Sequence, residues 1–439
     1  MRSVVWDTTS RCNLRCKHCY NGEKYFEHFR NDLTTDQVTA MLRFLKNQGC
    51  KKLSLLGGEP LFRTDILEVI KALREVNIPT QLTTNGTLLS GEIITAILSS
   101  PIEIINISLD GGTPTVNDAI RGRGSYDAVV RNVRCLMEEA KHINRNITIT
   151  IGYVVTMTNM QTSNDIIDLC KELGIQRIVV SSLMFSGNAV RNWDVIKINQ
   201  FKLLETVEQM IAYTQKNYPS LVFQIDGRPL LTKYFNMKYG IDVIYSIDYT
   251  KCGALDGLIY IEADGTCHPC GLYGMEVGKK AIAKQYFSID DVRNVKDLSD
   301  INQLYSTAYF TDFFESMHLL EKKDPSGHCT SCEFSNDCYL CPYQREGDII
   351  DCNFAVEKIT EYKQTLDGIV IDAIASVPKK FLSEREFDVY RNLRQCESVL
   401  RNFTYVKNAT NITEDEYLYI LHSLERRFII ERRPVLYEA

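Results

Sequence analysis

Short apolar segments alternate with amphipathic ones over about the first 200 residues of the chain. We expect β-strands at Val4–Trp6, Leu53–Leu56, Thr80–Thr83, Ile104–Ile107, Ile147–Thr150 and Arg177–Val180. Helical periodicity fills the gaps. The first helix should begin with a capping box, Thr34-x-x-Gln37, and then place Val38, Met41, Leu42 and Leu45 on one face. Repeats of this kind predict an α/β fold with a parallel sheet, either open or curved into a partial barrel.

The distinctive polar sequence follows these strands directly. The first strand is followed by Cys12, Cys16 and Cys19, the second by Gly57-Gly58-Glu59-Pro60, the third by Thr84-Asn85-Gly86 and the fourth by Ser108-Leu109-Asp110-Gly111. Any one of the last three segments is most often only a turn. Because the carboxyl ends of parallel strands meet at one edge of a sheet, the four segments together predict a functional site there.

Composition narrows the class of protein. The chain has 439 residues, 44% of them apolar, and a net charge of −6, which gives no global attraction for nucleic acid or anionic membrane. No apolar run reaches the roughly 18 residues that span a bilayer, and the first residues lack the apolar region of a signal peptide. We therefore expect a cytoplasmic protein that does not bind membranes. In that compartment the 15 cysteines indicate metal or redox chemistry rather than disulfides.

Three of the cysteines are spaced Cys12-x3-Cys16-x2-Cys19, so that one loop could hold three corners of an iron–sulfur cubane. Such a cluster normally takes four thiolates. No fourth cysteine lies nearby, which would leave one iron open to a ligand from outside the protein. The alternative is a zinc site completed by His18 or His28.

Four other cysteines stand alone in stretches with helical periodicity or at the ends of such stretches. They are Cys50, Cys135, Cys170 and Cys396. A lone cysteine in such a position is usually a small buried apolar residue, and we expect this of all four.

The run RCNLRCKHCY from Arg11 to Tyr20, followed by LLGGEP, TTNG and SLDG, resembles the radical S-adenosylmethionine (radical SAM) family over roughly residues 1–220. The resemblance implies a partial (β/α)6 TIM-like barrel over residues 1–225. In that family the open iron of a 4Fe–4S cluster chelates the amino and carboxylate groups of S-adenosylmethionine. An electron from the cluster cleaves this cofactor to methionine and a 5′-deoxyadenosyl radical, which abstracts hydrogen from an unactivated C–H bond.

The resemblance also implies roles for individual residues. Cys12, Cys16 and Cys19 would bind the cluster, and His18 takes the place of the usual aromatic residue beside the adenine. Gly57, Gly58 and Glu59 match the segment that meets the cofactor's amino group, a role that suits the close backbone approach of glycine and the charge of a carboxylate. Further cofactor contacts are implied for Asn85, Ser108, Asp110, Arg121 and Leu183. Asp110 could instead form only an Asx turn.

A second group of cysteines has the pattern Cys252-Gly253-x11-Gly265-x4-Cys270, then Cys329-x2-Cys332-x5-Cys338-x2-Cys341-x10-Cys352. It resembles the SPASM extension of radical enzymes, here residues 226–378, which carries up to two auxiliary 4Fe–4S clusters and would bring the total to three. The resemblance implies Cys329, Cys332, Cys338 and Cys352 as ligands of the distal cluster, and Cys252, Cys270 and Cys341 as ligands of the proximal one.

This second group departs from the family in two ways. The last close pair, Cys338 and Cys341, is separated by two residues where the family usually has three. The proximal cluster also lacks a fourth thiolate unless Cys267 supplies it. Otherwise one iron would be open to substrate. Zinc ribbons remain the structural alternative. The segment from Leu258 to Cys270 predicts a hairpin that turns at Asp264 and Gly265.

Residues 379–439 predict a small α+β module that resembles a winged helix. Ser383-x-x-Glu386 and Thr413-x-x-Glu416 are capping boxes, and Phe428–Tyr437 reads as strand, turn and strand. The module has 11 basic and 10 acidic residues, a balance that argues against nucleic acid. Peptide binding and simple packing as a structural cap are the two readings that remain.

These features together predict a radical SAM oxidoreductase or peptide maturase that acts on a ribosomally synthesised precursor peptide, by crosslinking, thioether formation or epimerisation. A reducing flavodoxin or ferredoxin is the expected second partner. A sulfatase-maturating enzyme is an alternative, weakened because Gly271 follows Cys270 where that type usually has an acidic residue. A small-molecule radical dehydrogenase and a DNA-binding iron–sulfur sensor are the others. The sequence assigns no catalytic acid or base.

Overall fold

The computed structural model describes residues 3–22, 31–184, 186–198, 200–226, 244–245, 253–274 and 291–322, the segments 369–373, 384–395 and 430–434, and single positions between 410 and 420. The chain separates into two compact units. One comprises Met1–Gly227 and Tyr245–Gly347, and the other Arg228–Ile244 and Asp348–Ala439. The domain boundaries at residues 225 and 378 stay predictions.

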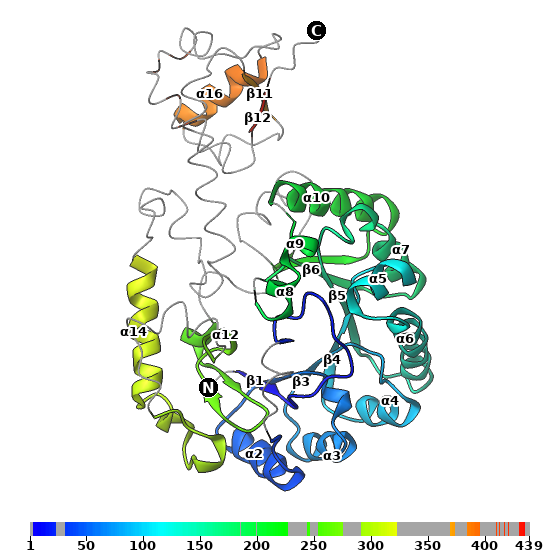
Figure 1. Ribbon diagram of the computed structural model, residues 1–439, viewed down its shortest axis with the longest axis vertical. Helices are drawn as coiled ribbons and strands as arrows, with labels where there is room; N and C mark the ends of the chain where they lie inside the picture. The colour runs from blue at the N-terminus through cyan, green and yellow to red at the C-terminus, as the bar shows by residue number, and fades with distance from the viewer. Residues whose placement is uncertain are drawn as a thin grey trace. The chain divides into compact units, whose positions relative to one another are not determined.

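A ten-stranded sheet organises the described residues up to His268, in the order β10-β9-β1-β2-β3-β4-β5-β6-β7-β8 (Figure 1). The strands are β1 Ser3–Asp7, β2 Lys52–Leu56, β3 Thr80–Thr84, β4 Ile102–Ser108, β5 Thr148–Val154, β6 Arg177–Ser181, β7 Val222–Asp226, β8 Ile244–Tyr245, β9 Leu258–Ile261 and β10 Cys267–His268. From β1 to β7 each strand pairs parallel with the next one in the sequence. A doubly wound sheet reverses its strand order, so this consecutive order fits the partial barrel rather than the open sheet.

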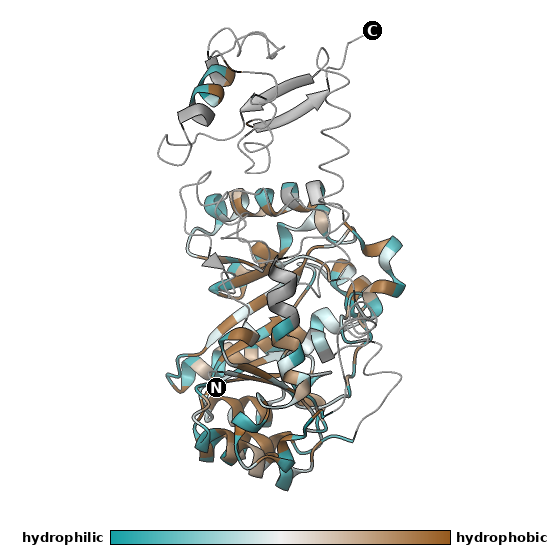
Figure 2. Ribbon diagram, turned by 90° about the vertical axis from the view of Figure 1, so that its left-hand side faces the viewer, coloured by the Kyte–Doolittle hydropathy of each residue, from teal (hydrophilic) through white to brown (hydrophobic). Residues whose placement is uncertain are grey.

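Helices fill the crossovers and form an outer layer around the strands (Figure 1). They are α2 Thr35–Asn47, α3 Ile66–Val76, α4 Gly91–Leu98, α5 Pro114–Arg121, α6 Ser125–His142, α7 Asp165–Glu172, α8 Asn188–Arg191, α9 Trp193–Ile196 and α10 Gln200–Asn217, with α12 Gly271–Gly274 and α14 Ala308–Lys322 further along. Figure 2 shows apolar residues on the strands and on one side of the helices. This is the arrangement expected of a parallel sheet whose faces are covered by helices.

Helix α2 shows how the sequence specifies one of these elements. The side chain of Thr34 accepts a hydrogen bond from the Gln37 backbone, and Gln37 Oε1 accepts one from the Thr34 backbone, which confirms the capping box. The predicted apolar face, Val38, Met41, Leu42 and Leu45, is at most 3% exposed. Burial of each of these side chains contributes about 2 kcal/mol, so packing rather than helix propensity holds α2 in place.

The hairpin predicted near Leu258 is confirmed, and it extends the sheet beside β1. Strand β9 pairs parallel with β1, with Val4 opposite Ile259, and β10 pairs antiparallel with β9. The turn lies at Asp264 and Gly265, where Gly265 has φ of 91°. This positive φ explains why glycine occupies that position.

In the second unit, β11 (Ile369–Ala373) pairs antiparallel with β12 (Ile430–Pro434), and α16 spans Glu384–Gln395. The start of α16 confirms the helix predicted after Ser383. The turn predicted inside Phe428–Tyr437 is wrong, because Arg432 and Arg433 lie within β12 and pair with Ile371 and Val370. The local run of charged residues and proline looked like a turn, but pairing with a distant strand decided the conformation.

Two of the four isolated cysteines behave as predicted. Cys50 and Cys170 are 6% and 0% exposed. The prediction is wrong for Cys135, which is exposed, because it lies on the outer face of the amphipathic helix α6. Cys396 lies outside the described residues.

Among the described residues, none of the helices combines the length and the apolar character that crossing a lipid bilayer requires.

Candidate functional site

The loop that carries Cys12, Cys16 and Cys19 begins where β1 ends, at the carboxyl edge of the sheet. All three cysteines are half-buried. The loop, dark blue in Figure 1, runs across the inner side of the strands and reaches α8. The end of α5 supports it, because the Lys17 backbone donates to the carbonyl of Ile120 over 2.9 Å.

Burial controls the pKa of the three thiols. Burial raises the pKa of Cys12 to about 11 and that of Cys19 to about 12, and it also raises the pKa of Cys16. Arg121 partly opposes this rise at Cys16, since its Nη1 lies 4.0 Å from Cys16 Sγ. Metals bind the thiolate, so the protons that these groups retain at neutral pH would be released when a metal binds.

The two glycines of the Gly57-Gly58-Glu59 segment are needed for contact with the chain's own cysteine loop. Gly58 donates to the carbonyl of Thr9 over 2.9 Å, and Glu59 donates to that of Arg11 over 2.8 Å. A Cβ atom on Gly58 would lie 2.2 Å from the Arg11 carbonyl oxygen, and Gly57 has φ of +131°. The predicted contact of this segment with a cofactor stays a prediction, while its contact with the loop is direct.

Glu59 connects the segments that follow β2 and β3. Its side chain is buried, and its carboxylate accepts hydrogen bonds from the Thr84 hydroxyl at 2.6 Å and from the Asn85 and Leu61 backbones at 2.7 and 3.1 Å. Burial raises the pKa of Glu59, although these hydrogen bonds oppose the rise. The Asn85 amide in turn donates to Asn13 Oδ1 over 2.9 Å, which ties this network to the cysteine loop.

Asp110 joins two other predicted site residues. Its Oδ2 lies 2.8 Å from His18 Nε2 and 2.6 Å from Arg121 Nε, and its Oδ1 accepts a hydrogen bond from the Val154 backbone at 2.8 Å. Burial alone would raise the pKa of Asp110, but Arg121 and His18 hold it well below its ordinary value. The carboxylate is fully buried, and both of its oxygens contact groups outside its own turn, so it is more than an Asx turn.

The remaining predicted contacts lie at the same edge of the sheet. Ser108 is the last residue of β4 and Leu183 follows β6 by two residues, and both are half-buried. Apart from Arg121, the last residue of α5, the predicted cofactor-binding residues thus lie at the carboxyl ends of strands or in the segments that directly follow them.

Sequence reasoning missed two groups that hold the loop. Arg63 is 4% exposed, and its guanidinium donates to the carbonyls of Thr8 and Leu33. The segment from Ser186 to Asn192 donates several hydrogen bonds to loop carbonyls. Neither had a readable signal, because a buried arginine or a capping asparagine looks like any polar surface residue in a single sequence.

The three thiols of the cysteine loop match the thiolate ligands that an iron–sulfur cluster takes. Among the described residues, no three His, Cys, Asp or Glu side chains converge as ligands of one metal ion. A cubane binds each thiolate at a separate corner and does not require such convergence. The zinc alternative needs His18, whose Nε2 is already paired with Asp110, or His28, which lies outside the described residues.

One further observation bears on the cofactor. His18 Nδ1 is buried, and none of the described residues forms a hydrogen bond with it. Buried polar atoms nearly always have a partner, so this nitrogen fits a site completed by a bound molecule.

Of the auxiliary cysteines, only Cys267 and Cys270 fall among the described residues. Cys267 lies in β10, is fully buried, and has its Sγ 3.6 Å from the Gly265 carbonyl oxygen. Cys270 is half-buried and directly precedes α12. The other predicted ligands lie outside the described residues: Cys252, Cys329, Cys332, Cys338, Cys341 and Cys352.

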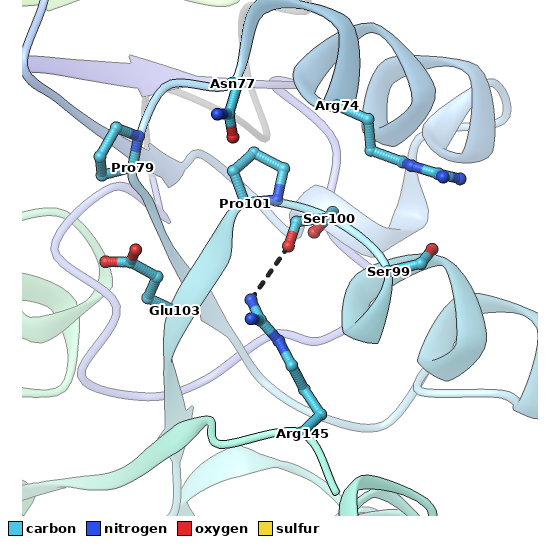
Figure 3. A pocket seen from close by; sticks show the side chains of 8 residues that line it. All are labelled: Arg74, Asn77, Pro79, Ser99, Ser100, Pro101, Glu103 and Arg145. Carbon is cyan, nitrogen blue, oxygen red and sulfur yellow. Dashed lines mark hydrogen bonds between the residues drawn. The ribbon is translucent and has the colours of Figure 1, made fainter. Parts of the chain in front are cut away.

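A hollow of about 370 Å³ lies at the opposite edge of the sheet (Figure 3). It is lined by residues between the ends of α3 and α4 and the starts of β3 and β4, among them Arg74, Ser100 and Glu103. Arg145 reaches into it and donates to the Ser100 carbonyl over 3.2 Å. The amino edge of such a sheet usually serves stability, so we do not assign the active site to this hollow.

Several curated proteins are similar to this chain. Fe-coproporphyrin III synthase of Methanosarcina barkeri is 30% identical over 51% of the chain, and the chain spans only 55% of that protein. AdoMet-dependent heme synthase of Oleidesulfovibrio alaskensis is 25% identical over 77% of the chain and 82% of its own length. Mycofactocin maturase MftC of Mycolicibacterium smegmatis is 29% identical over 44% of the chain and 47% of its length.

Solved structures share the fold. Streptococcus suis SuiB bound to the precursor peptide SuiA has a TM-score of 0.60 at 20% identity, over 78% of this chain and 72% of that one. Native anSMEcpe with bound AdoMet has a TM-score of 0.58 at 16% identity, over 83% of this chain and 100% of that one.

The match to a family is confined to the first part of the chain. Residues 6–166 match the profile of the radical SAM superfamily. The match ends before the second group of cysteines, so the SPASM assignment stays a prediction. The matched range includes the three cysteines and the polar segments after β2, β3 and β4. This confirms the resemblance inferred from those residues. Residues 6–166 of this chain are therefore a radical SAM domain.

Proposed function

We propose that this protein is a radical SAM enzyme that abstracts hydrogen from a precursor peptide and so modifies it after translation. The observation that carries the proposal is the position of Cys12, Cys16 and Cys19 on one loop at the carboxyl edge of the barrel, beside the buried group of Asp110, His18 and Arg121. In this arrangement the three thiolates would hold a 4Fe–4S cluster and leave one iron to S-adenosylmethionine.

When bound, the cluster and S-adenosylmethionine together supply a 5′-deoxyadenosyl radical for hydrogen abstraction. The chain's own residues hold and shape that site. Arg121 places a positive charge beside Cys16, and Asp110 fixes the guanidinium and the His18 ring. His18 Nδ1, which is buried and has no hydrogen-bond partner among the described residues, would meet the adenosyl part of the cofactor. Gly57, Gly58, Glu59 and Asn85 bring the segments after β2 and β3 against the loop.

The second cysteine group would bind two auxiliary clusters, which makes three in all. Its proposed ligands are those of the SPASM resemblance, with Cys267 completing the proximal set. Cys267 lies in β10, which pairs with β9, and β9 pairs with β1, so a proximal cluster would lie close to the barrel. A flavodoxin or ferredoxin of the cytoplasm would supply the electrons.

Two findings favour a peptide as the substrate. The relatives include a mycofactocin maturase and a PqqA peptide cyclase, and the fold is similar to that of SuiB over 78% of the chain, well beyond the radical SAM domain. The C-terminal module, with its balanced charge, would then contact the peptide rather than nucleic acid.

The first experiment tests the radical chemistry. Changing all three of Cys12, Cys16 and Cys19 to Ala should remove about four irons from anaerobically reconstituted protein and abolish 5′-deoxyadenosine, which chromatography measures. Cys135→Ala, a change at an exposed cysteine, is the control and should leave both unchanged. A triple variant that still produces 5′-deoxyadenosine would overturn the proposal.

A tetrapyrrole is the second candidate substrate. AdoMet-dependent heme synthases align with 77% and 82% of this chain, a longer span than the 44% that aligns with the mycofactocin maturase. The two candidates are separated by incubating the reconstituted enzyme either with an iron tetrapyrrole or with peptides encoded beside its gene. Mass change in a peptide with no change in the tetrapyrrole supports our proposal, and the reverse result supports the second candidate.

A further inference from the structure

The segment from Ser186 to Asn192, after β6, lies directly against the cysteine loop. The Asn188 backbone donates to the carbonyl of Cys19 over 2.8 Å, and its side-chain amide donates to the carbonyl of Cys16 over 3.1 Å. On either side, Asn192 Nδ2 donates to the Lys17 carbonyl over 3.1 Å and Ser186 Oγ to that of Tyr20 over 2.9 Å. One segment thus donates hydrogen bonds to four carbonyls between Cys16 and Tyr20, the part of the loop that carries two of the predicted cluster ligands.

The two surfaces fit closely. Gly187 has φ of +56°, and a Cβ atom there would lie 2.5 Å from the carbonyl oxygens of Cys19 and Tyr20. From the other side, a Cβ atom on Gly22 would lie 2.3 Å from the Asn188 side chain. Glycine at both positions lets the two backbones approach closely enough for the hydrogen bonds to form.

Asn188 differs from its neighbours because the two carbonyls that it holds belong to cysteines. A carbonyl fixed by a donor fixes its peptide plane, and with it the direction in which the preceding Cα carries its side chain. Ordering a loop residue costs roughly 1–2 kcal/mol, so a loop ordered before metal arrives binds it more tightly. Asn188 makes these contacts through separate groups, the backbone and the amide, so a substitution can remove one and keep the other.

We propose that Asn188 is a positioning residue that holds Cys16 and Cys19 in the arrangement required by the cluster. The inference rests on the proposed function, because it supposes that these thiols bind iron. It makes the segment after β6 part of the cluster site. Leu183, predicted to contact the adenine, lies five positions before Asn188, so the residues that follow β6 would reach both the cofactor and the ligand loop.

The test compares Asn188→Ala and Asn188→Asp with Asn217→Ala. Both changes at Asn188 keep the backbone bond to Cys19 and remove the amide bond to Cys16, and Asp also turns an oxygen toward that carbonyl. Asn217→Ala is the matched control, because Asn217 Nδ2 likewise donates to a carbonyl, that of Tyr213 in α10, over 3.0 Å. Reconstituted protein is challenged with an iron chelator and a thiol-alkylating reagent, and the alkylation rate of each cysteine is followed by peptide mass spectrometry.

We expect Asn188→Ala to expose Cys16 to alkylation about fivefold faster than in the wild type, the effect of one neutral hydrogen bond. Asn188→Asp should be faster still, and Asn217→Ala should match the wild type. Cys270 serves as an internal reference, since general unfolding would accelerate its alkylation as well. The electron paramagnetic resonance signal of the reduced radical SAM cluster should also change in the Asn188 variants.

Wild-type rates at Cys16 in both folded Asn188 variants would overturn the inference, and so would equal acceleration at Cys16 and Cys270. If both Asn188 variants fail to fold, Asn192→Ala replaces them. This change removes the amide bonds to the carbonyls of Lys17 and Asn188, and it should still accelerate alkylation of Cys16 relative to Cys270; equal rates would again overturn the inference. Absence of iron from the wild-type protein would instead refute the proposed function itself.

Discussion

Arg63 Nη1 donates a hydrogen bond to the carbonyl oxygen of Thr8 over 2.7 Å. Nη2 of the same guanidinium donates to the carbonyl of Leu33, and Nε lies 2.7 Å from Asp65 Oδ1. Thr8 precedes the three cysteines and Leu33 directly precedes the cap of α2, so one buried cation holds both ends of the segment that carries the ligands. Asp65 balances the charge that this burial would otherwise leave uncompensated.

Arg63→Met should lower the free energy of unfolding by about 3 kcal/mol, because two carbonyls and a carboxylate lose a charged donor. Urea unfolding of anaerobic protein, followed by circular dichroism, measures this. Arg43→Met is the matched control. Arg43 pairs with Glu75 at 3.1 Å, but the two side chains are 63% and 49% exposed, and the expected loss is under about 0.5 kcal/mol. Equal midpoints for the two variants would show that Arg63 does not brace the loop.

Gly58→Ala should disturb the cysteine loop, since the added methyl would meet the Arg11 carbonyl oxygen at 2.2 Å. We expect lower stability by about 2 kcal/mol and less iron after reconstitution. Gly91→Ala is the control, because a Cβ there meets nothing within 4 Å and lies at the start of α4, where alanine favours the helix. Iron content and the unfolding midpoint should be preserved in Gly91→Ala. An iron content in Gly58→Ala equal to that of the control would contradict the close contact.

The buried carboxylate of Asp110 should make stability depend on pH. Burial alone would raise its pKa, but Arg121 and His18 lower the pKa below that of the unfolded chain. Its contribution is therefore fully present above the unfolded-state pKa of about 4 and is lost as pH falls through the lower folded-state value. Thermal unfolding between neutral and acidic pH should show a steeper loss for the wild type than for Asp110→Asn.

Two comparisons check that result. Asp110→Asn should also be less stable than the wild type at neutral pH, by about 3 kcal/mol, because it leaves Arg121 buried with a weaker partner. Asp194→Asn, at a carboxylate that is 94% exposed, should keep the wild-type dependence on pH. Identical acid sensitivity in Asp110→Asn and the wild type would rule out the ion pair as its source.

Cys267→Ala tests the proximal cluster. If Cys267 is the fourth thiolate, the change should alter the auxiliary signals in electron paramagnetic resonance and leave cleavage of S-adenosylmethionine largely intact. Cys170→Ala is the control, since Cys170 is also 0% exposed and lies in α7, away from any predicted ligand set. Spectra of Cys267→Ala that match those of Cys170→Ala would favour an open iron.

The elements of the barrel could be predicted because their signals are local. The capping box of Thr34 and Gln37 and the apolar face that follows it depend on contacts within a turn or two of helix. The run from Cys12 to Cys19 holds three ligands on one loop, so its spacing alone indicated the chemistry. The parallel arrangement of the strands then predicted that the site lies at their carboxyl edge.

Tertiary structure decided the contacts that hold the site, because these join residues far apart in the chain. Asn188 and Cys16 are 172 positions apart, and Arg121 and Cys16 are 105 apart. The sequence by itself determined which residues could bind a cluster and near which strand ends they would lie. Only the folded chain determined that Asp110 pairs with His18 and Arg121, since a buried charge takes whichever partners the packing brings within hydrogen-bonding distance.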